Sequence, residues 1–377
     1  MRRGRGKAVA RSALVTGVVV GSMVLAGCST SAPSASNSAA PSGSDGAAPA
    51  TTVTYAQGVP LEAGSGAQCK KSGKAVSALR IAYIPPASVY NYYLAIGAGM
   101  EARAKEVGAS YKMLAPAKDD VSIQVGMIQD AATSGVDAIV LHTHDEAASA
   151  PVLARVAAQG IDIILVNSDI PKFPTPVNAV VGYKERAGDK LVGQYAVKAA
   201  NGQPGTIGIL EGAPGYDSTE RVGGFKEGIA GASNLKVVAS LNGKWDVDNG
   251  NKAATDMLQA NPDITMIFAA NDYMATGAVQ AAKAVGRNVI IYGSDGDPNA
   301  GLEPIAAGGI KATLDTSPFS MGRVAMQVAI DCLTGALTGG DYIETPGTVV
   351  DKATVNAVLC KPDQLFPKPA KTYPCSS

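Results

Sequence analysis

The sequence has very few histidines, and this scarcity limits the chemistry to be expected of it. Only two of its 377 residues are histidines, His142 and His144, and they stand two positions apart. A Ser-His-Asp arrangement would need one of them, but no G-x-S-x-G stretch marks a nucleophilic serine. The stretch "GAGMEA" (97–102) matches G-x-G-x-x-A, yet it lies within a helical apolar pattern rather than at a strand-to-helix turn. We therefore expect neither an enzyme nor a cofactor.

The sequence also lacks an excess of charge of either sign. Lysine and arginine total 32, as do aspartate and glutamate, so the formal net charge is zero. Proteins that bind nucleic acid normally carry a basic patch or stripe. Because the two signs are interspersed here, we expect no nucleic-acid partner.

No apolar run is long enough to predict a membrane span. The first such run, "LVTGVVVGSMVLAG", follows a basic stretch and ends directly before Cys28. This arrangement resembles a bacterial lipoprotein signal peptide (1–27) and implies lipid attachment at Cys28; the alternative is an ordinary secretory signal. Residues 28–75 begin with a Ser-, Ala- and Pro-rich stretch, which predicts a flexible tether. We expect an extracytoplasmic, membrane-anchored protein.

Four further cysteines follow Cys28, and export would permit disulfides among them. Cys69 precedes the first expected strand, while Cys360 and Cys375 lie in the C-terminal tail, so one terminal disulfide is expected there. Its connectivity stays open. Cys332 lies in an apolar helical stretch, where we expect a buried free thiol.

From residue 78 onward, short apolar runs alternate with longer amphipathic stretches that end at glycine. The expected strands are 79–84, 109–114, 136–142, 161–167 and 178–183, and then 205–210, 235–241, 266–271, 288–295 and 310–316. Apolar strands separated by crossover helices form parallel sheets. The restart of the pattern predicts an α/β fold with two doubly wound parallel-sheet lobes.

Polar and aromatic residues gather directly after the expected strands, as in "PPASVYNYY", "HTHDE" and "GSDGDP". In open α/β sheets, ligands bind beyond the carboxyl ends of the strands. Two such edges facing each other would form a cleft for a small, polar, hydroxyl-rich molecule.

Four stretches carry a family resemblance: "GAPGYDSTERVGGFKEGI", "ANDYMATGAVQAAKAVG", "YGSDGDP" and "IKATLDTSPFSMG". Together and in this order they resemble the sugar-binding type I periplasmic binding proteins, the group that contains ribose-binding protein. The resemblance implies a monomeric, hinged receptor that delivers its ligand to an ABC permease.

The resemblance also implies lobe boundaries. The N-terminal lobe would comprise 76–176 and about 317–345. The C-terminal lobe would comprise 177–316 and about 346–360, with a tail at 361–377. The three hinge crossings are expected near Pro174–Val180, Thr316–Pro318 and Glu344–Gly347.

The family's ligand-binding positions are carried over by the same motifs. They fall on Tyr92, Tyr93, Arg221, Trp245, Asn271 and Asp295. An acceptor-only aspartate, a donor-only arginine and an asparagine that does both can saturate neighbouring hydroxyl groups. Aromatic faces would cover the C–H surface of a sugar.

The chain departs from the ribose-type pattern at two places. Asn167 and Ser168, followed by Asp169, replace an aspartate–arginine pair, and Thr316, preceded by Asp315, replaces a glutamine. Asn167, Asp169 and Thr316 are therefore expected to contact a ligand other than ribose. Rhamnose, the furanosyl signal autoinducer-2 and short polyols such as xylitol or erythritol remain open.

The two histidines lie at the carboxyl end of the expected strand 136–142, the third of the first lobe, and therefore on the cleft edge. We interpret His142 and His144 as part of the pocket wall, with His142 contacting the ligand. A metal site is the less favoured interpretation, because Asp145 and Glu146 are expected in the first turn of the next helix.

Of the other functions, a LacI-type repressor would need an N-terminal helix-turn-helix. A receptor for an autoinducer-2-type signal remains the alternative to nutrient uptake.

Overall fold

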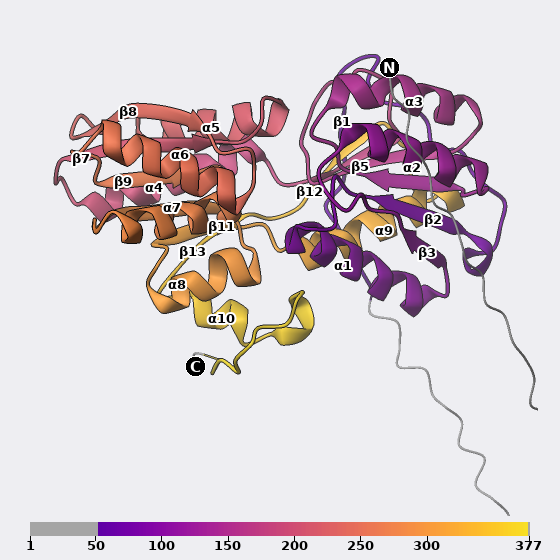
Figure 1. Cartoon of the computed structure of the whole chain (residues 1–377). Helices are drawn as coiled ribbons and strands as arrows, with labels where there is room; N and C mark the ends of the chain where they lie inside the picture. Colours follow the sequence, from indigo (N-terminus) through magenta and orange to yellow (C-terminus); the bar gives the residue numbers. More distant parts are fainter. Residues whose placement is uncertain (1–51, 376–377) are drawn as a thin grey trace, which may run out of the picture. The chain divides into compact units, whose positions relative to one another are not determined.

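The computed structural model describes residues 52–375, which lie in one compact unit containing two β-sheets (Figure 1). The first sheet has the order β1-β12-β6-β5-β4-β2-β3 and the second β13-β11-β10-β9-β7-β8. We call the first sheet with its helices the first lobe, and the second sheet with its helices the second lobe. All neighbours are parallel except β1 on β12 and β13 on β11. The expected α/β fold with two parallel-sheet lobes is confirmed.

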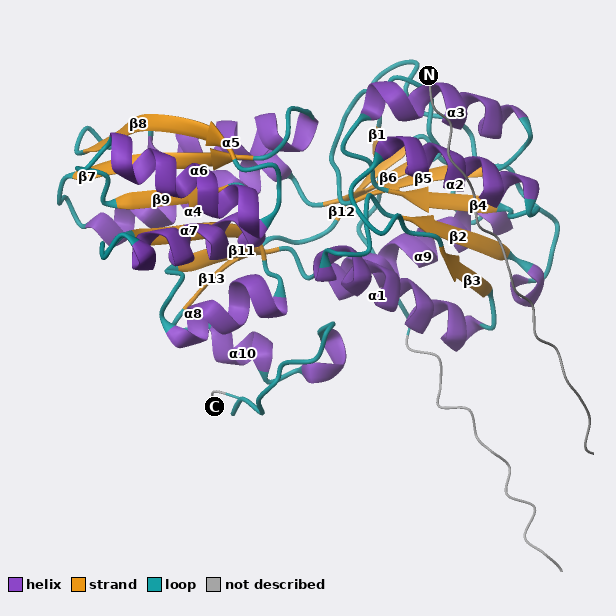
Figure 2. Ribbon diagram, viewed as in Figure 1, coloured by secondary structure: helices purple, strands orange, loops and turns teal. Residues whose placement is uncertain are grey.

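The strands of the first sheet are β1 (Val59–Pro60), β2 (Arg80–Ile84), β3 (Ser110–Met113), β4 (Ala138–Leu141), β5 (Asp162–Val166), β6 (Ala179–Gly182) and β12 (Asp341–Glu344). Those of the second are β7 (Gly205–Glu211), β8 (Leu235–Asn242), β9 (Met266–Ala269), β10 (Ile290–Asp295), β11 (Ala312–Asp315) and β13 (Thr348–Asp351). Figure 2 shows the strands between layers of helices.

The helices of the first lobe are α1 (Asn91–Val107), α2 (Val121–Thr133), α3 (Glu146–Ala158) and α9 (Pro318–Thr334). Those of the second are α4 (Glu185–Ala200), α5 (Tyr216–Ile229), α6 (Val247–Ala260), α7 (Asp272–Ala284) and the short α8 (Glu303–Ala307). A short helix α10 (Val355–Leu359) precedes the C-terminal segment.

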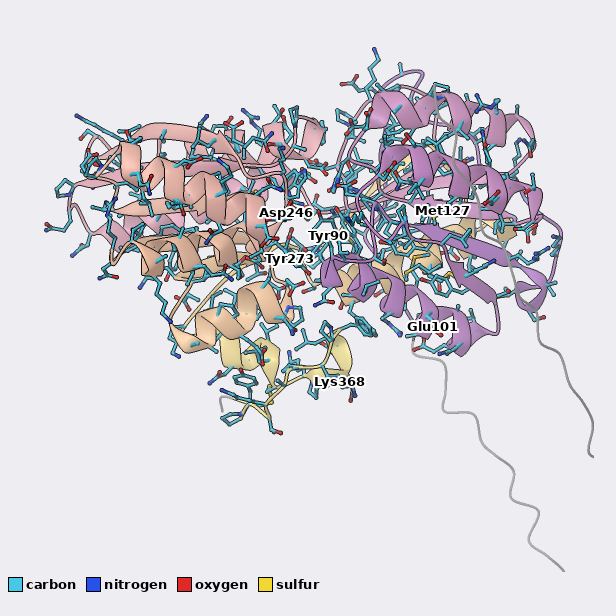
Figure 3. The ribbon with its side chains drawn as sticks, in the orientation of Figure 1. Tyr90, Glu101, Met127, Asp246, Tyr273 and Lys368 are labelled. Atoms are coloured by element: carbon cyan, nitrogen blue, oxygen red, sulfur yellow. A yellow bond between two sulfur atoms is a disulfide. The ribbon has the colours of Figure 1, made fainter. Side chains whose placement is uncertain are left out.

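The core explains why the central strands are apolar throughout. Successive strand residues point to opposite faces. Accordingly, Val140 packs in the cluster that contains residues of α1 and α9, whereas Ile139 and Leu141 pack in the cluster that contains residues of α2 and α3. Met127 of α2 packs against this second cluster (Figure 3). A sheet covered on both faces needs apolar residues at every position.

The sheets correct the expected lobe boundary at residue 177. β6 pairs with β5 and β12, so residues 179–182 belong to the first sheet. α4 packs on α5 and β11, so the chain passes to the second lobe between Gly182 and Glu185. The expected crossing near Pro174–Val180 is therefore wrong, since the apolar stretch there continues as a strand. The other two passages lie between β11 and α9 and between β12 and β13.

Residues 52–75 are packed rather than free, which corrects that part of the expected tether. Val59 and Pro60 pair with β12. The backbone N–H of Lys70 donates to the Asp162 carboxylate at 3.0 Å. Residues 28–51 have few large apolar side chains, but in residues 52–75 both Tyr55 and Leu61 pack against the core. Cys28 and the predicted signal peptide lie outside the described residues.

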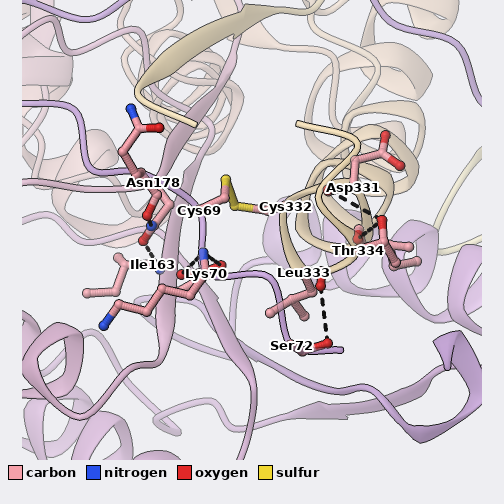
Figure 4. The surroundings of a disulfide bond; sticks show 12 residues. Cys69, Lys70, Ser72, Ile163, Asn178, Asp331, Cys332, Leu333 and Thr334 are labelled. Carbon is pink, nitrogen blue, oxygen red and sulfur yellow. Dashed lines mark hydrogen bonds between the residues drawn. A yellow bond between two sulfur atoms is a disulfide. The ribbon is translucent and has the colours of Figure 1, made fainter. Parts of the chain in front are cut away.

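A disulfide fixes the same segment to the first lobe. Cys69 is bonded to Cys332 of α9 (Figure 4). The expectation of a free thiol at Cys332 is therefore wrong, because the preceding segment folds back over the helix. A second disulfide joins Cys360 and Cys375. Among the described residues, no helix has the length and apolar character needed to cross a membrane.

Candidate functional site

A cavity lies where the carboxyl ends of the two sheets meet. β2 lies between β3 and β4, and β7 between β8 and β9, so the strand order reverses at β2 and at β7. Ligands bind beyond the strands at such reversals. The cavity is lined by Tyr90, Tyr92, Tyr93, His144, Asp217, Arg221, Trp245, Asn271, Tyr273 and Asp295. Six of the ten predicted ligand-binding residues therefore line one cavity: Tyr92, Tyr93, Arg221, Trp245, Asn271 and Asp295.

A buried ion pair forms the polar centre of this cavity. Arg221 of α5 donates from Nη1 to Asp295 Oδ1 at 2.7 Å and to the Ala270 carbonyl at 3.0 Å. Burial raises the pKa of Asp295 to about 6, although the Arg221 guanidinium opposes this shift. The guanidinium carbon also lies 5.4 Å from the Trp245 ring centroid, within cation–π distance.

Asn271 fixes two parts of the cavity lining, the start of α7 and the loop that carries Trp245. It begins α7, and its Oδ1 accepts a hydrogen bond from the backbone N–H of Met274. Its Nδ2 donates to the Trp245 carbonyl at 2.9 Å. Asn271 is thus a helix cap and also fixes the loop that carries the tryptophan.

Unusual backbone conformations gather around the site. Six described non-glycine residues have positive φ, and three of them are Asn167 (60°), Trp245 (68°) and Asp295 (128°). Such conformations cost about 1–3 kcal/mol each and persist where the surrounding structure enforces them. Asp295 and Trp245 both line the cavity. The strained backbone therefore lies where side chains point into the cavity.

Aromatic side chains form the wall. Tyr90 packs edge-to-face on Tyr93 at 6.0 Å and on Tyr273 at 5.4 Å between ring centroids. The Tyr273 hydroxyl accepts a hydrogen bond from the backbone N–H of Asn91 at 2.6 Å and donates to Asp297 at 3.0 Å. Figure 3 shows Tyr90 and Tyr273 labelled next to each other. Tyr273 belongs to α7, so it links the second lobe to α1.

The two histidines have different positions. His144 lines the cavity, stacks on Trp245 with 5.7 Å between centroids, and lies 2.8 Å from the Tyr93 hydroxyl. His142 lies behind the lining: its ring stacks on Tyr93 at 5.2 Å, and its Nε2 is 3.1 Å from Asp217 Oδ2. As predicted, Asp145 caps α3 by accepting from the Ala148 N–H.

Three further predicted residues also lie behind the lining. The Tyr92 hydroxyl donates to Asn167 Oδ1 at 2.6 Å and is 2.8 Å from Thr316 Oγ1. Asn167 and Thr316 therefore orient Tyr92. Asp169 accepts from the hydroxyl of Tyr216 at 3.0 Å, and like the other two it is not among the residues that line the cavity.

The sequence motifs did not identify Tyr90, Asp217 or Tyr273 as site residues, and they pointed to His144 only together with His142. Asp217 lies four residues before Arg221 and therefore on the same face of α5, which is a signal that the sequence offered. Burial raises the pKa of Asp217, but His142, Arg221 and His144 outweigh burial and leave this pKa below its usual value. The cavity thus contains a second carboxylate that stays charged.

Comparisons with known proteins agree with this arrangement. The model of the periplasmic binding protein domain matches residues 81–337. The D-ribose/D-allose-binding protein of Pseudomonas aeruginosa is 30% identical over 285 residues, which is 72% of this chain and 88% of that protein.

Two solved structures with bound small molecules are also similar. One is a solute-binding protein of Actinobacillus succinogenes with bound D-allose (27% identity, TM-score 0.67, 74% of this chain and 99% of that one). The other is a solute-binding protein of Mycobacterium smegmatis with bound glycerol (27% identity, TM-score 0.70, 79% and 100%). The family match, the fold and the interlobe cavity agree: the chain belongs to the periplasmic binding protein family.

Proposed function

We propose that this protein is an extracytoplasmic solute-binding lipoprotein of an ABC importer. It is anchored by lipid on Cys28, binds one neutral monosaccharide or sugar alcohol between its lobes, and delivers it to a membrane permease as a monomer. The observation that carries the proposal is the buried Arg221–Asp295 pair at the centre of an aromatic-walled cavity.

The chemistry of the cavity suits a neutral polyhydroxylated ligand. Arg221 offers only donors and the two carboxylates of Asp217 and Asp295 only acceptors, whereas hydroxyl groups can serve both. The charges of Arg221 and Asp295 are already matched, since these two side chains form an ion pair. A charged ligand would leave one of these buried groups without its partner, which is unfavourable.

The wall and the relatives support the same ligand class. Tyrosine and tryptophan faces cover C–H groups and exclude water. The related structures contain D-allose and glycerol, and the Pseudomonas relative is named for D-ribose and D-allose. The molecules bound by these relatives, or given in their names, range from a three-carbon polyol to a hexose. The proposal therefore specifies a class of ligand and not one sugar.

Binding between lobes explains how occupancy would be signalled to a permease. A ligand that contacts both lobes stabilises the closed state, because only that state offers all contacts. Calorimetric titration of the chain from residue 29 onward against pentoses, hexoses, deoxysugars and four- to six-carbon polyols tests the proposal. We expect saturable binding of at least one of them; no binding to any would contradict the carbohydrate assignment.

A further inference from the structure

His142, His144 and Asp217 form a cluster that sugar binding does not account for. One ligand atom from each of the three lies within 4.8 Å of the other two. His142 is 3% exposed and Asp217 is 6% exposed, so both are almost completely withdrawn from water. Groups that are buried to this degree need partners for all their polar atoms.

The proton positions on His142 leave one nitrogen without a partner. Its Nδ1 is 3.1 Å from the Val166 carbonyl, which can only accept, so Nδ1 carries the hydrogen. In the neutral ring, Nε2 therefore presents a lone pair. This nitrogen has no hydrogen-bond partner, although Asp217 Oδ2 is only 3.1 Å away. Two electron-donating atoms thus lie side by side without a well-aligned hydrogen between them.

His144 has a matching arrangement. Its Nδ1 lies 2.6 Å from Asp119 Oδ2, so the carboxylate fixes the hydrogen on Nδ1 and the lone pair on Nε2. Histidines that bind metal ions usually donate their other ring N–H to a carboxylate or a backbone carbonyl. Here His144 donates to a carboxylate and His142 to a carbonyl. The Tyr93 hydroxyl, 2.8 Å from His144 Nε2, is the one competitor for that lone pair.

We infer that His142, His144 and Asp217 form a binding site for a divalent transition-metal ion, best suited to Zn²⁺, in the wall of the cavity. Two imidazoles and one carboxylate are a ligand set that zinc accepts, with a fourth position open to another molecule. A metal at His144 replaces the hydrogen bond from Tyr93. The open position faces a cavity lined by His144 and Asp217; occupation of that position by a ligand hydroxyl rests on the proposed function.

The site would join the two lobes. The histidines follow β4 of the first sheet, whereas Asp217 lies in the first turn of α5 in the second lobe. A metal held by all three residues is bound only when the lobes are together. Zinc and a polyol that both favour the closed state will strengthen each other's binding by the same factor.

The test uses tag-free chain from residue 29 onward, treated with EDTA and dialysed, titrated calorimetrically with ZnCl₂ in the absence of any sugar. We expect one Zn²⁺ per chain, no response to MgCl₂, and visible absorption bands of a tetrahedral site with CoCl₂. His142→Gln and Asp217→Asn should each weaken zinc binding by at least about tenfold. Unchanged circular dichroism and melting temperature would show that both variants fold.

The outcomes separate this inference from the proposed function. No zinc binding, or zinc binding unaffected by both substitutions, overturns the metal site and favours a protonated His142 paired with Asp217. Polyol titrations with and without zinc on the same preparation are judged independently. Zinc binding without binding of any polyol would contradict the proposed function and leave the metal site standing.

Discussion

At the scale of single residues, the cavity depends on charged groups that are kept from water and matched in pairs. Arg221 is held by Asp295 and by a carbonyl, and Asp295 has a strained φ of 128° that aims its carboxylate. A hydrogen bond to a charged group contributes about 1.5–3 kcal/mol. We therefore expect removal of one charge to weaken ligand binding and to leave the other member of the pair without its partner.

Asp295→Asn tests this pair directly. The substitution keeps the size of the side chain but removes the charge opposite Arg221, so we expect ligand affinity to fall by roughly 10- to 100-fold. Calorimetry measures the change. Asp256→Asn, an exposed position on α6, is the matched control and should bind like wild type. Wild-type affinity in Asp295→Asn would remove this residue from the site.

Asp189 provides a pH prediction. It is fully buried on α4, and burial raises its pKa from 3.8 to about 8 against the opposing effects of Arg221 and Ser294. Because the folded state holds this proton more tightly than the unfolded state, the contribution of Asp189 to stability is greatest at low pH and is lost as pH rises from about 4 to about 8. Each unit of pKa difference corresponds to about 1.4 kcal/mol.

Asp189→Asn mimics the protonated form and should remove this loss. We expect the variant to resist urea more than wild type above pH 8, with the advantage shrinking toward pH 4. Urea unfolding of both proteins at several pH values measures the difference in their stability. Parallel pH profiles for the two proteins would mean that Asp189 is not the titrating group.

The residue scale also shows what sequence reasoning could reach. Arg221, Asn271 and Asp295 were predicted because they belong to family motifs. Asn271 and Asp295 lie at strand ends and Arg221 lies in α5, and the fold brings the three together. His144 and Asp217 come from different lobes, and no local sequence pattern specifies that they meet. Asn167 and Thr316 were assigned to the ligand, yet in the structure they bond to the Tyr92 hydroxyl. Matching a family motif does not distinguish a residue that contacts the ligand from one that orients another side chain of the cavity.

At the scale of elements, apolar periodicity in the sequence predicted most strands and helices. It did not predict which lobe each of them belongs to. β6 has the apolar run of a buried strand, but only its partners β5 and β12 assign it to the first sheet. β12 and β13 were not predicted, since each is four residues long and β13 is partly exposed. A strand of four residues carries too little apolar pattern to be recognised from the sequence alone.

The contact between α1 and α9 gives a prediction at this scale. A Cβ added at Gly322 would lie 1.9 Å from the Ile96 carbonyl oxygen, and one at Gly99 2.0 Å from that of Phe319. Gly322→Ala must push the helices apart, so we expect a loss of about 1–3 kcal/mol in the free energy of unfolding.

Gly126 in α2 provides the matched control. A Cβ there would have no neighbour within 4 Å, so Gly126→Ala should stabilise the protein by about 0.5–1 kcal/mol through helix propensity. Urea denaturation of both variants measures the difference. Equal effects of the two substitutions would show that the close approach of α1 and α9 is not needed.

At the scale of the whole molecule, Tyr216 of the second lobe contacts the first lobe outside the cavity. Tyr216 of α5 packs against the apolar cluster of the first lobe, and its hydroxyl donates to Asp169 beyond β5 at 3.0 Å. Neither residue lines the cavity. In the proposed function such a contact would exist only in the closed state, so it would adjust the equilibrium between open and closed forms without touching the ligand.

Tyr216→Phe separates closure from ligand contact. Losing one interlobe hydrogen bond should weaken apparent affinity by about 2- to 10-fold, since a net hydrogen bond contributes about 0.5–1.5 kcal/mol. Tyr195→Phe is the control, because the Tyr195 hydroxyl donates to Asp351 at 2.9 Å within the second lobe. Calorimetry gives affinity, and small-angle X-ray scattering gives the compaction at saturating ligand, which should be the same in all three proteins.

If Tyr195→Phe lost as much affinity as Tyr216→Phe, the effect would come from general destabilisation. If neither lost any, contacts outside the cavity would not contribute to closure, and the ligand alone would hold the lobes together.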